Sequence, residues 1–376
     1  MVRGYEGWAL DQALIVDAST PGFFAASCRW GAARRQAAYL VLARLNDGDV
    51  TVLARHLDGA LLERGIAVDA GSEPRVIVGR ALLALRPRRV LRAALGGFLP
   101  PGLIGTLTKL GFYPLEISGS YAEIVHFFAS GDDDVRARVR VLTQHRGPLI
   151  IGQIRALAGL EPDLVHRAVV PHIRDPESAR TFADAVAYLR RCCSGATPEA
   201  LRASLDAWPV DRDIKHWVRR WADRFDRPPG LHDLARALAG RPGIKLLATG
   251  ADLVAAERRY RWGLYDMVPE VLVGRHAYVE YRPTVPGGRV LVAVLRWSEH
   301  GYVLDRIHRP DHHLGHDPGH AVLQQHLRGA GVIVKSRVPV GPRMHAAMRA
   351  WFGIYPRDLN EVDDPDTRPF DAEGDA

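Results

Sequence analysis

The segment from Val271 to Trp297 decides the fold class expected for the C-terminal part of this chain. It runs VLVGRHAYVEYR over residues 271–282 and VLVAVLRW over residues 290–297, with Pro286-Gly287-Gly288 between the two runs. β-Branched and aromatic residues favour strands, and Pro-Gly-Gly favours a turn, so the segment predicts a β-hairpin. Tyr302–Ile307 has the same composition and predicts a third strand.

Helices are expected on both sides of these strands. Ile244–Leu247 leads to Thr249, a residue type that caps helix N-termini, and a helix is predicted from there to Tyr265. Three further elements are predicted beyond the third strand: a helix over Ala321–Leu327, a strand over Val332–Val334 and a helix over Pro342–Phe352.

The first 243 residues are predicted to be mainly helical, because apolar residues recur there every three to four positions. Residues 1–30 are the exception: they mix aromatic residues with Gly and Pro and predict irregular structure or short strands. The predicted helices cover residues 34–45, 50–62, 76–95 with a break at Pro87, 103–110, 121–130, 135–144, 149–158, 163–173, 176–191, 211–225 and 231–238.

The expected fold class is therefore α+β, with a predominantly helical N-terminal domain and a smaller C-terminal domain of β-hairpin and helices. The expected boundaries are residues 1–243 for the basic helical domain, 244–356 for the α+β domain and 357–376 for an acidic tail. The tail is expected to be disordered, because it combines few apolar residues with many carboxylates.

The overall composition is that of a globular protein. Of the 376 residues, 47% are hydrophobic and 25% are charged, and no apolar run is long enough for a membrane span. The N-terminus lacks the pattern of a secretory signal. The three cysteines, Cys28, Cys192 and Cys193, do not form a disulfide framework, so reduced thiols and a cytoplasmic location are expected.

The positive charge is concentrated before the tail. The chain has a net charge of +7, and its last twenty residues hold two basic and eight acidic side chains, so the remainder carries +13. Such a body suits polyanions, because neutralising phosphates releases counterions. An alternative explanation of this charge stays open. Only four of the fifty basic residues are Lys and the rest are Arg, and the codon usage of a GC-rich genome enriches arginine without any role in binding.

Two groups of basic residues are candidates for contacts with nucleic-acid phosphates. The first lies around Pro87, and no aromatic residue is interleaved with it, so stacking on unpaired bases is not indicated there. The second lies on the predicted helix 211–225, opposite an apolar stripe that contains Trp217 and Trp221; core tryptophans and a solvated basic face are the alternative. The candidate residues are Arg80, Arg86, Arg88, Arg89 and Arg92 in the first group and Arg212, Lys215, Arg219 and Arg220 in the second.

A histidine-rich loop follows the third strand and contains His308, His312, His313, His316 and His320. Imidazoles and carboxylates at short spacing can hold a divalent metal ion, and a histidine at a strand end can activate water in a metal-dependent nuclease. In that interpretation His308 and Asp305 are catalytic, and His312, His316 and His320 are metal ligands. The alternative is a polar surface loop without a cofactor, since Pro310 and Gly315 favour turns and the Asn usual in such nucleases is missing.

Ile151–Val170 has the apolar spacing of a helix-turn-helix. Its second helix would begin with Glu161, Pro162 and Asp163, and carboxylates at that end would repel phosphate, so an ordinary helical hairpin is favoured. The chain lacks a phosphate loop, a dinucleotide fingerprint and a nucleophile elbow.

Residues 247–327 resemble the C-terminal region of PcfJ-like proteins of conjugative plasmids and phages. In that family a helix ending in a His-Cys-Val-Gly-x-Tyr-like motif precedes a β-hairpin, and here Tyr260-Arg261-Trp262-Gly263-Leu264-Tyr265 precedes the predicted hairpin. Gly263 and Tyr265 keep the pattern, whereas Tyr260 and Arg261 replace the His and Cys, so no role of that thiol carries over. The resemblance implies a mobile-element protein and does not imply catalysis.

Three functions follow from these features. The leading hypothesis is a non-enzymatic, nucleic-acid-associated accessory protein of a bacterial mobile element or defence-related locus, which contacts phosphates through its arginines. The alternatives are a metal-dependent nuclease that uses the histidine loop and a helical adaptor that binds a protein partner. None of the three requires a membrane.

Overall fold

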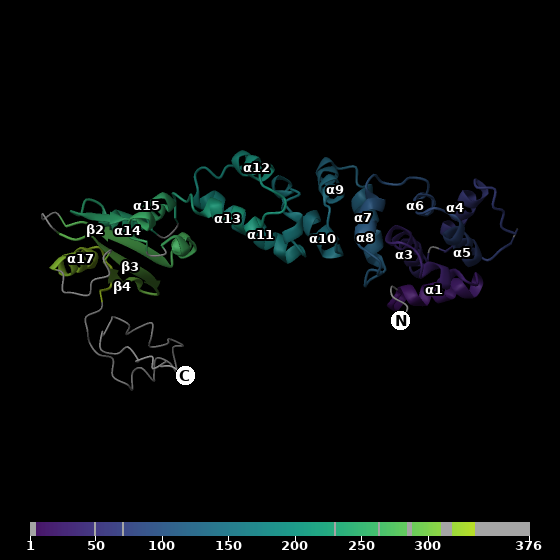
Figure 1. Cartoon of the computed structure of the whole chain (residues 1–376), viewed down its shortest axis with the longest axis horizontal. Coiled ribbons are helices and arrows are strands. Elements are labelled where there is room, and N and C mark those ends of the chain that lie inside the picture. Colours follow the sequence, from purple (N-terminus) through teal and green to yellow (C-terminus); the bar gives the residue numbers. More distant parts are fainter. Residues whose placement is uncertain are drawn as a thin grey trace, which may run out of the picture. The chain divides into compact units, whose positions relative to one another are not determined.

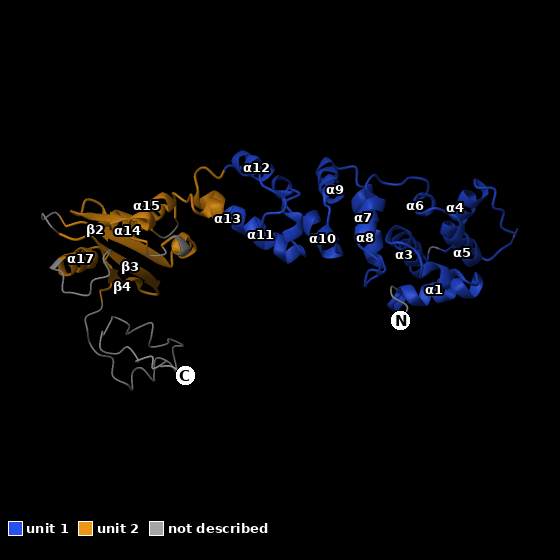
Figure 2. Ribbon diagram, viewed as in Figure 1, with its two compact units in different colours: residues 1–187, 197–218 blue, residues 188–196, 219–376 orange. Residues whose placement is uncertain are grey.

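The computed structural model describes residues 5–48, 50–69, 71–228, 231–261, 264–283, 288–309 and 318–334, whose course is drawn in Figure 1. The chain forms two compact units: unit 1 comprises residues 1–187 and 197–218, and unit 2 comprises residues 188–196 and 219–376 (Figure 2). Helices dominate, and a four-stranded antiparallel sheet lies near the C-terminus of the described part, which confirms the α+β class. Residues 241–243, where the sequence suggests a junction, lie inside unit 2.

The first part of unit 1 is a group of helices around α3. Leu40, Val41 and Leu42 of α3 are at most 1% exposed, and the helix packs against α1, α4, α6, α7 and α8. Residues 35–43 are all buried, Arg35 and Gln36 among them, as expected of a helix at the centre of such a group. The elements are α1 (Gly7–Ser19), α2 (Phe23–Ser27), α3 (Ala32–Asn46), α4 (Val50–Leu62), α5 (Pro74–Ala84), α6 (Pro87–Ala94), α7 (Leu103–Lys109), α8 (Gly119–Ala129), α9 (Asp133–Gln144) and α10 (Ile151–Gly159).

The prediction of irregular structure or short strands over residues 1–30 was wrong, because α1 and α2 occupy most of that segment. Ala9, Ala13 and Val16 of α1 are fully buried at helical spacing, and α1 packs against α3 and α5. Tertiary packing of one apolar stripe outweighs the local signal of aromatic residues, Gly and Pro.

Several cations of unit 1 hold the C-terminal carbonyls of neighbouring helices, which otherwise have no partner within their own helix. Arg34 donates to the carbonyls of Leu82 and Leu83 at the end of α5, at 3.0 and 2.6 Å. Arg138, which is 8% exposed, donates to the carbonyls of Leu157 and Leu160 at the end of α10, both at 2.8 Å. These cations stabilise the fold and are unavailable for a ligand.

Beyond α10 the chain forms short turns and then longer helices. The elements are η1 (Pro162–Leu164), η2 (Val170–His172), α11 (Pro176–Cys192), α12 (Pro198–Asp206) and α13 (Ile214–Ala222). The predicted helix over residues 163–173 is wrong, and the recognition helix of a helix-turn-helix and the second arm of a helical hairpin are therefore both missing. Pro162 and Pro171 lack the N–H group that an α-helix needs, and single 3₁₀ turns form around them.

The apolar stripe predicted on residues 211–225 is largely buried. Trp217 is 0% exposed and Trp221 is 6% exposed, so both tryptophans belong to the core, as the structural alternative predicted. Val210 is 38% exposed and lies outside the helix, because α13 is shorter than predicted. No helix of the described residues is both long and apolar enough to cross a membrane.

Unit 2 is built on the antiparallel sheet, whose strands follow the order β1-β2-β3-β4. Residues 291–295 of the central strand β3 are all buried, which requires cover on both faces of the sheet. The elements are α14 (His232–Leu238), β1 (Ile244–Leu246), α15 (Gly250–Tyr260), η3 (Leu264–Met267), α16 (Val268–Leu272), β2 (His276–Tyr281), β3 (Leu291–Ser298), β4 (Gly301–His308) and α17 (Pro318–Gly329).

The hairpin, the third strand and the helix near residues 321–327 are confirmed, with shifted boundaries. The helix predicted to reach Tyr265 ends at Tyr260, because Arg261 takes the left-handed conformation at φ 56°. The first strand begins at His276 instead of Val271, since α16 runs to Leu272 and Gly274 turns the chain at φ 74°. Thr249 caps α15 as expected, because its hydroxyl accepts the N–H of Asp252 at 3.1 Å.

The strand predicted over Val332–Val334 is reduced to one parallel bridge between Ile333 and Val303. Its backbone contacts are hydrogen bonds with Tyr302 and Leu304 of β4. The predicted helix over Pro342–Phe352 and the acidic tail lie outside the described residues.

Candidate nucleic-acid interface

Four of the arginines predicted around Pro87 belong to one short helix, α6. Arg86 is its N-cap, and Arg88, Arg89 and Arg92 lie on its exposed side. Arg92 lies four residues after Arg88 and three after Arg89, so it neighbours both on the helix surface. The opposite side, formed by Val90, Leu91, Ala93 and Ala94, is buried against the rest of unit 1. We call Arg86, Arg88, Arg89 and Arg92 the α6 basic face.

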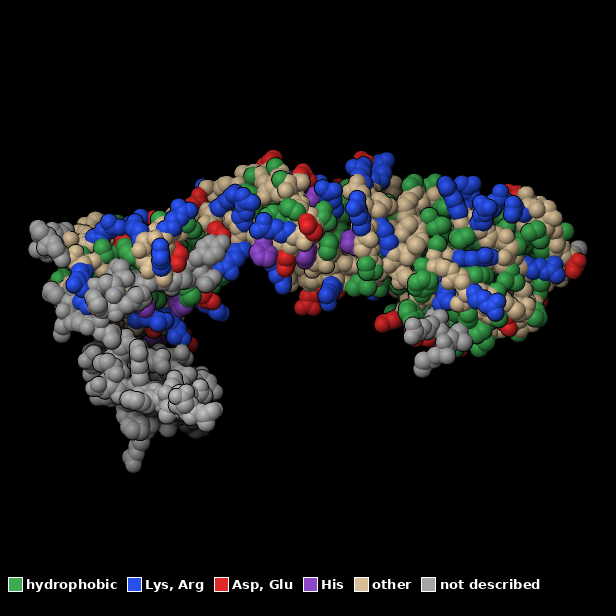
Figure 3. Space-filling view, in the orientation of Figure 1, with side chains coloured by type: hydrophobic (Ala, Val, Ile, Leu, Met, Phe, Trp, Pro, Cys, Tyr) green, Lys and Arg blue, Asp and Glu red, His purple; other side chains and the backbone are tan. Residues whose placement is uncertain are grey.

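The α6 basic face has no neutralising partner within the described residues. None of its four arginines forms an ion pair with a carboxylate there, whereas Arg136, Arg155 and Arg202 of the same unit each pair with an acidic residue. The sequence explains this, because residues 74–115 contain seven basic residues and no Asp or Glu. On the face of the molecule drawn in Figure 3, Lys and Arg outnumber Asp and Glu over α4 and α5.

Three of these arginines, Arg86, Arg88 and Arg89, lie at the N-terminal end of α6, where a cation is unfavourable for the helix. Arg92 lies in the last turn, where a cation is favourable. The N-terminus of a helix carries a partial positive charge, so acidic residues are favoured in the first turn and each cation there costs about 0.3–1 kcal/mol. The first turn of α6 has no acidic residue and instead holds Arg88 and Arg89 next to the N-cap Arg86. At the opposite end Arg44 donates to the carbonyl of Ala94, where a cation is favourable. The α6 basic face is therefore not explained by the stability of α6.

The other predicted phosphate-binding residues are placed differently. Arg80 lies half-buried on α5, which packs against α6. Arg212 and Lys215 belong to unit 1, whereas Arg219 and Arg220 belong to unit 2. The guanidinium of Arg212 lies over the ring of Trp208 at 4.8 Å from its centroid. The second predicted group therefore does not form part of the α6 basic face.

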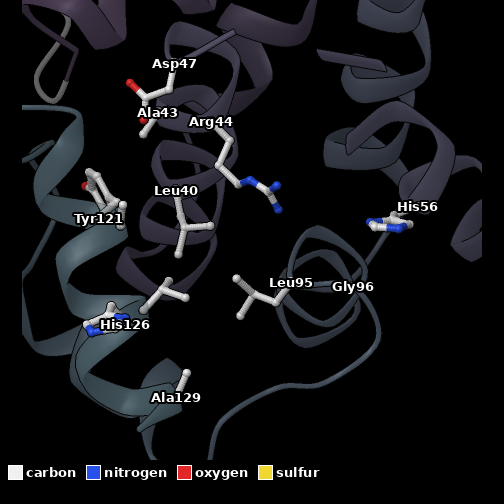
Figure 4. Close-up of a pocket in the computed structure, with 12 residues that line it drawn as sticks. Leu40, Ala43, Arg44, Asp47, His56, Leu95, Gly96, Tyr121, His126 and Ala129 are labelled. Atoms are coloured by element: carbon white, nitrogen blue, oxygen red, sulfur yellow. The ribbon is translucent and has the colours of Figure 1, made fainter. Parts of the chain in front are cut away.

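A groove of about 630 Å³ opens in unit 1 beside the C-terminal end of α6. Figure 4 shows Leu40 and Arg44 of α3, Leu95 and Gly96 after α6, and His126 of α8 around it, with His56 of α4 on the far side. The volume lies in the range of small-molecule sites, and mainly apolar walls with a few polar groups are typical of them. His126 and His56 are exposed, and the sequence pattern did not mark either residue.

An exposed aromatic residue, which the sequence pattern did not mark, follows the end of α6. Phe98 is 63% exposed, the highest value among the large apolar side chains of the described residues. It follows the turn that ends α6, and the N–H of Gly97 donates to the carbonyl of Arg92 at 2.8 Å. The aromatic residue is not interleaved with the arginines, but it comes directly after a turn that is hydrogen-bonded to the carbonyl of Arg92.

The structure does not assemble the predicted metal site from the described residues. Asp305 lies at a β-bulge of β4 and pairs with Arg306 at 3.3 Å, His308 ends β4, and His320 lies on α17. No group of three His, Cys, Asp or Glu side chains that could hold a metal ion occurs among the described residues. His312 and His316 lie outside them, so the nuclease hypothesis stays a prediction.

His276, the first residue of β2, lies near enough to Asp305 for the carboxylate to influence its pKa. Its Nδ1 is buried and has no hydrogen-bond partner in the part of the chain that the structure describes. Burial lowers the pKa of His276, while Glu270 and Asp305 oppose that effect. The imidazole is therefore neutral at pH 7.

Glu280 of β2 is a buried carboxylate that is stabilised by three neighbouring side chains. It is 1% exposed and accepts hydrogen bonds from the hydroxyl of Tyr260 at 2.7 Å, from Arg259 at 3.0 Å and from Arg282 at 2.5 Å. Burial by itself would raise the pKa of Glu280, but these donors, Tyr260 first, hold it below its usual range. The carboxylate is thus ionised and ties α15 to the sheet.

Comparisons with protein-family models, curated proteins and solved structures gave no match to this chain. The PcfJ-like resemblance of residues 247–327 therefore stays a prediction from the sequence.

Proposed function

We propose that unit 1 binds nucleic acid, without catalysing a reaction on it, through the α6 basic face. The observation that carries the proposal is a set of four arginines on one helix, exposed at Arg86, Arg88, Arg89 and Arg92, without a carboxylate partner in the described residues. Guanidinium groups bind phosphate through paired N–H donors, and a helix N-terminus adds a favourable field for an anion. Bound phosphates would remove the electrostatic cost that these cations impose on the first turn of α6.

The accessory role in a bacterial mobile element or defence-related locus is part of the proposal and is supported only by the PcfJ-like resemblance. A protein that attaches to nucleic acid through phosphate contacts is compatible with that role, because such contacts position a protein without reading sequence.

The experiment compares two triple variants of the full chain. Arg88→Gln/Arg89→Gln/Arg92→Gln removes three members of the α6 basic face. The control, Arg136→Gln/Arg155→Gln/Arg202→Gln, removes three arginines of unit 1 that are paired with Asp133, Glu123 and Asp206. Both variants lose the same formal charge, so a difference between them reports position rather than net charge.

Binding is measured by fluorescence anisotropy with labelled single-stranded and duplex DNA and RNA over a salt series. Each lost phosphate contact lowers the slope of log affinity against log salt by about 0.9 for duplex DNA and about 0.7 for single strands. The α6 variant should therefore lose about 2 to 3 from the slope, and the control should lose much less. Affinity that is indifferent to salt, or equal losses in the two variants, would refute the proposal and favour the protein adaptor.

A further inference from the structure

We infer that the nucleic acid bound by the α6 basic face is single-stranded, and that Phe98 and the adjoining groove take its unpaired bases. This inference rests on the proposed function and goes beyond it, because phosphate contacts alone do not distinguish a single strand from a duplex. Three features support it: the exposure of Phe98, the turn that holds it and the apolar surface beside it.

The exposure of Phe98 is not a consequence of a poorly packed helix end. Leu95, the C-cap of α6, is followed by Gly96 and Gly97, which have φ values of 74° and 101°. The N–H of Gly96 bonds to Ala93 and that of Gly97 bonds to Arg92, so both ends of the turn are held by hydrogen bonds. This is the Schellman arrangement, which favours glycine because of its positive φ values. The turn fixes the backbone next to Phe98 while leaving the ring 63% exposed.

The same turn bonds the backbone next to Phe98 to Arg92, the member of the α6 basic face nearest the C-terminal end of the helix. Arg92 supplies the carbonyl that closes the turn, and its side chain is on the exposed side of α6. A guanidinium for phosphate and an aromatic ring for a base, a few residues apart, are the two components of surfaces that bind single strands. A duplex offers phosphates to Arg92 but keeps its bases stacked, so the ring would have no partner.

The groove provides surface for a base next to the stacked one. Leu95 and Gly96 of the turn line one side of it, and the exposed Ala122 and Ala129 of α8 line the other. The imidazoles of His56 and His126 lie among its polar groups, and both can donate or accept hydrogen bonds at base edges. The groove thus combines mainly apolar walls with two imidazoles that can bond to the edge of a base.

The test uses the full chain with single-stranded and duplex oligonucleotides of the same sequence, as DNA and as RNA. Phe98→Ala should weaken single-strand binding about 5- to 150-fold, the range for loss of one base–aromatic stack, and change duplex binding less than about twofold. Phe98→Trp should restore single-strand binding. Tyr113→Ala, which removes another exposed aromatic side chain of unit 1, is the control and should have little effect.

Ala122→Trp fills the groove from an exposed position and should also weaken single-strand binding selectively. Circular dichroism confirms that each variant is folded. Equal effects of Phe98→Ala on single strands and duplex, or no effect on either, overturn the stacking role; an unchanged affinity in Ala122→Trp overturns the role of the groove. If the α6 triple variant also binds normally, the proposed function itself has failed, whereas a weakened triple variant with a neutral Phe98→Ala refutes this inference alone.

Discussion

The buried contact between Tyr260 and Glu280 permits a quantitative prediction for unit 2. Tyr260→Phe removes one hydroxyl that donates to Glu280 at 2.7 Å and leaves the ring in place. A hydrogen bond to a charged group contributes about 1.5–3 kcal/mol, and Tyr260 and Glu280 are 8% and 1% exposed, so water replaces the hydroxyl poorly. We expect the variant to lower the free energy of opening of β2 and β3 by about 2 kcal/mol.

Hydrogen exchange measured by mass spectrometry on peptides from β2 and β3 localises this effect to unit 2. A loss of about 2 kcal/mol corresponds to roughly 30-fold faster exchange of the amides that need this opening. The matched control is Tyr281→Phe on the same strand, since Tyr281 makes no side-chain hydrogen bond within the described residues and its ring lies near His326. That change should cost less than about 0.5 kcal/mol.

The pH dependence gives a second criterion for the same pair. Because the folded-state pKa of Glu280 is lowered from 4.5, its contribution is present above that pH and is lost as the pH falls through the lower folded value. Tyr260→Phe should raise the pKa of Glu280, so the variant should begin to lose this contribution at a higher pH than the wild type. Equal exchange in Tyr260→Phe and Tyr281→Phe, with identical pH profiles, would refute the assignment of Glu280 as a stabilising ion.

Two further predictions concern unit 1. Gly152→Ala should destabilise the protein by about 1–3 kcal/mol in urea denaturation, because the added Cβ would lie 2.1 Å from the carbonyl oxygen of Arg174. The control, Gly159→Ala on the same helix, meets no atom within 4 Å and should be neutral or stabilising. Equal urea midpoints for the two variants would contradict this prediction. His166 is buried and its Nδ1 accepts the N–H of Ala168 at 3.2 Å, and since burial lowers its pKa from 6.5, stability should fall as the pH drops below that value. His166→Asn should flatten this dependence between pH 7 and 5, and parallel wild-type and variant profiles would show that His166 is not its source.

Local sequence patterns determined much of the secondary structure. The apolar spacing of residues 50–62 predicted α4 with its observed bounds, and Pro87 placed the break between α5 and α6. The turn-forming residues between the strand-forming runs predicted the hairpin of β2 and β3. These features depend on residues close in the chain, so the sequence contains the information that sets them. Where distant packing competed, as for α1, the local signal failed. Over residues 163–173 the apolar spacing was misleading because Pro162 and Pro171 interrupt the helix.

The tertiary structure decided which arginines are available to a ligand. The sequence alone does not distinguish Arg34 and Arg138 from Arg88 and Arg92. In the fold, the first two donate to helix carbonyls and the second two are exposed. The fold likewise brought Phe98 to the end of α6 through the Gly96-Gly97 turn. The sequence determined the number and sign of the charges. The tertiary structure decided which arginines meet a helix end and which stay exposed, because helix packing depends on burial of apolar surface between segments far apart in the chain.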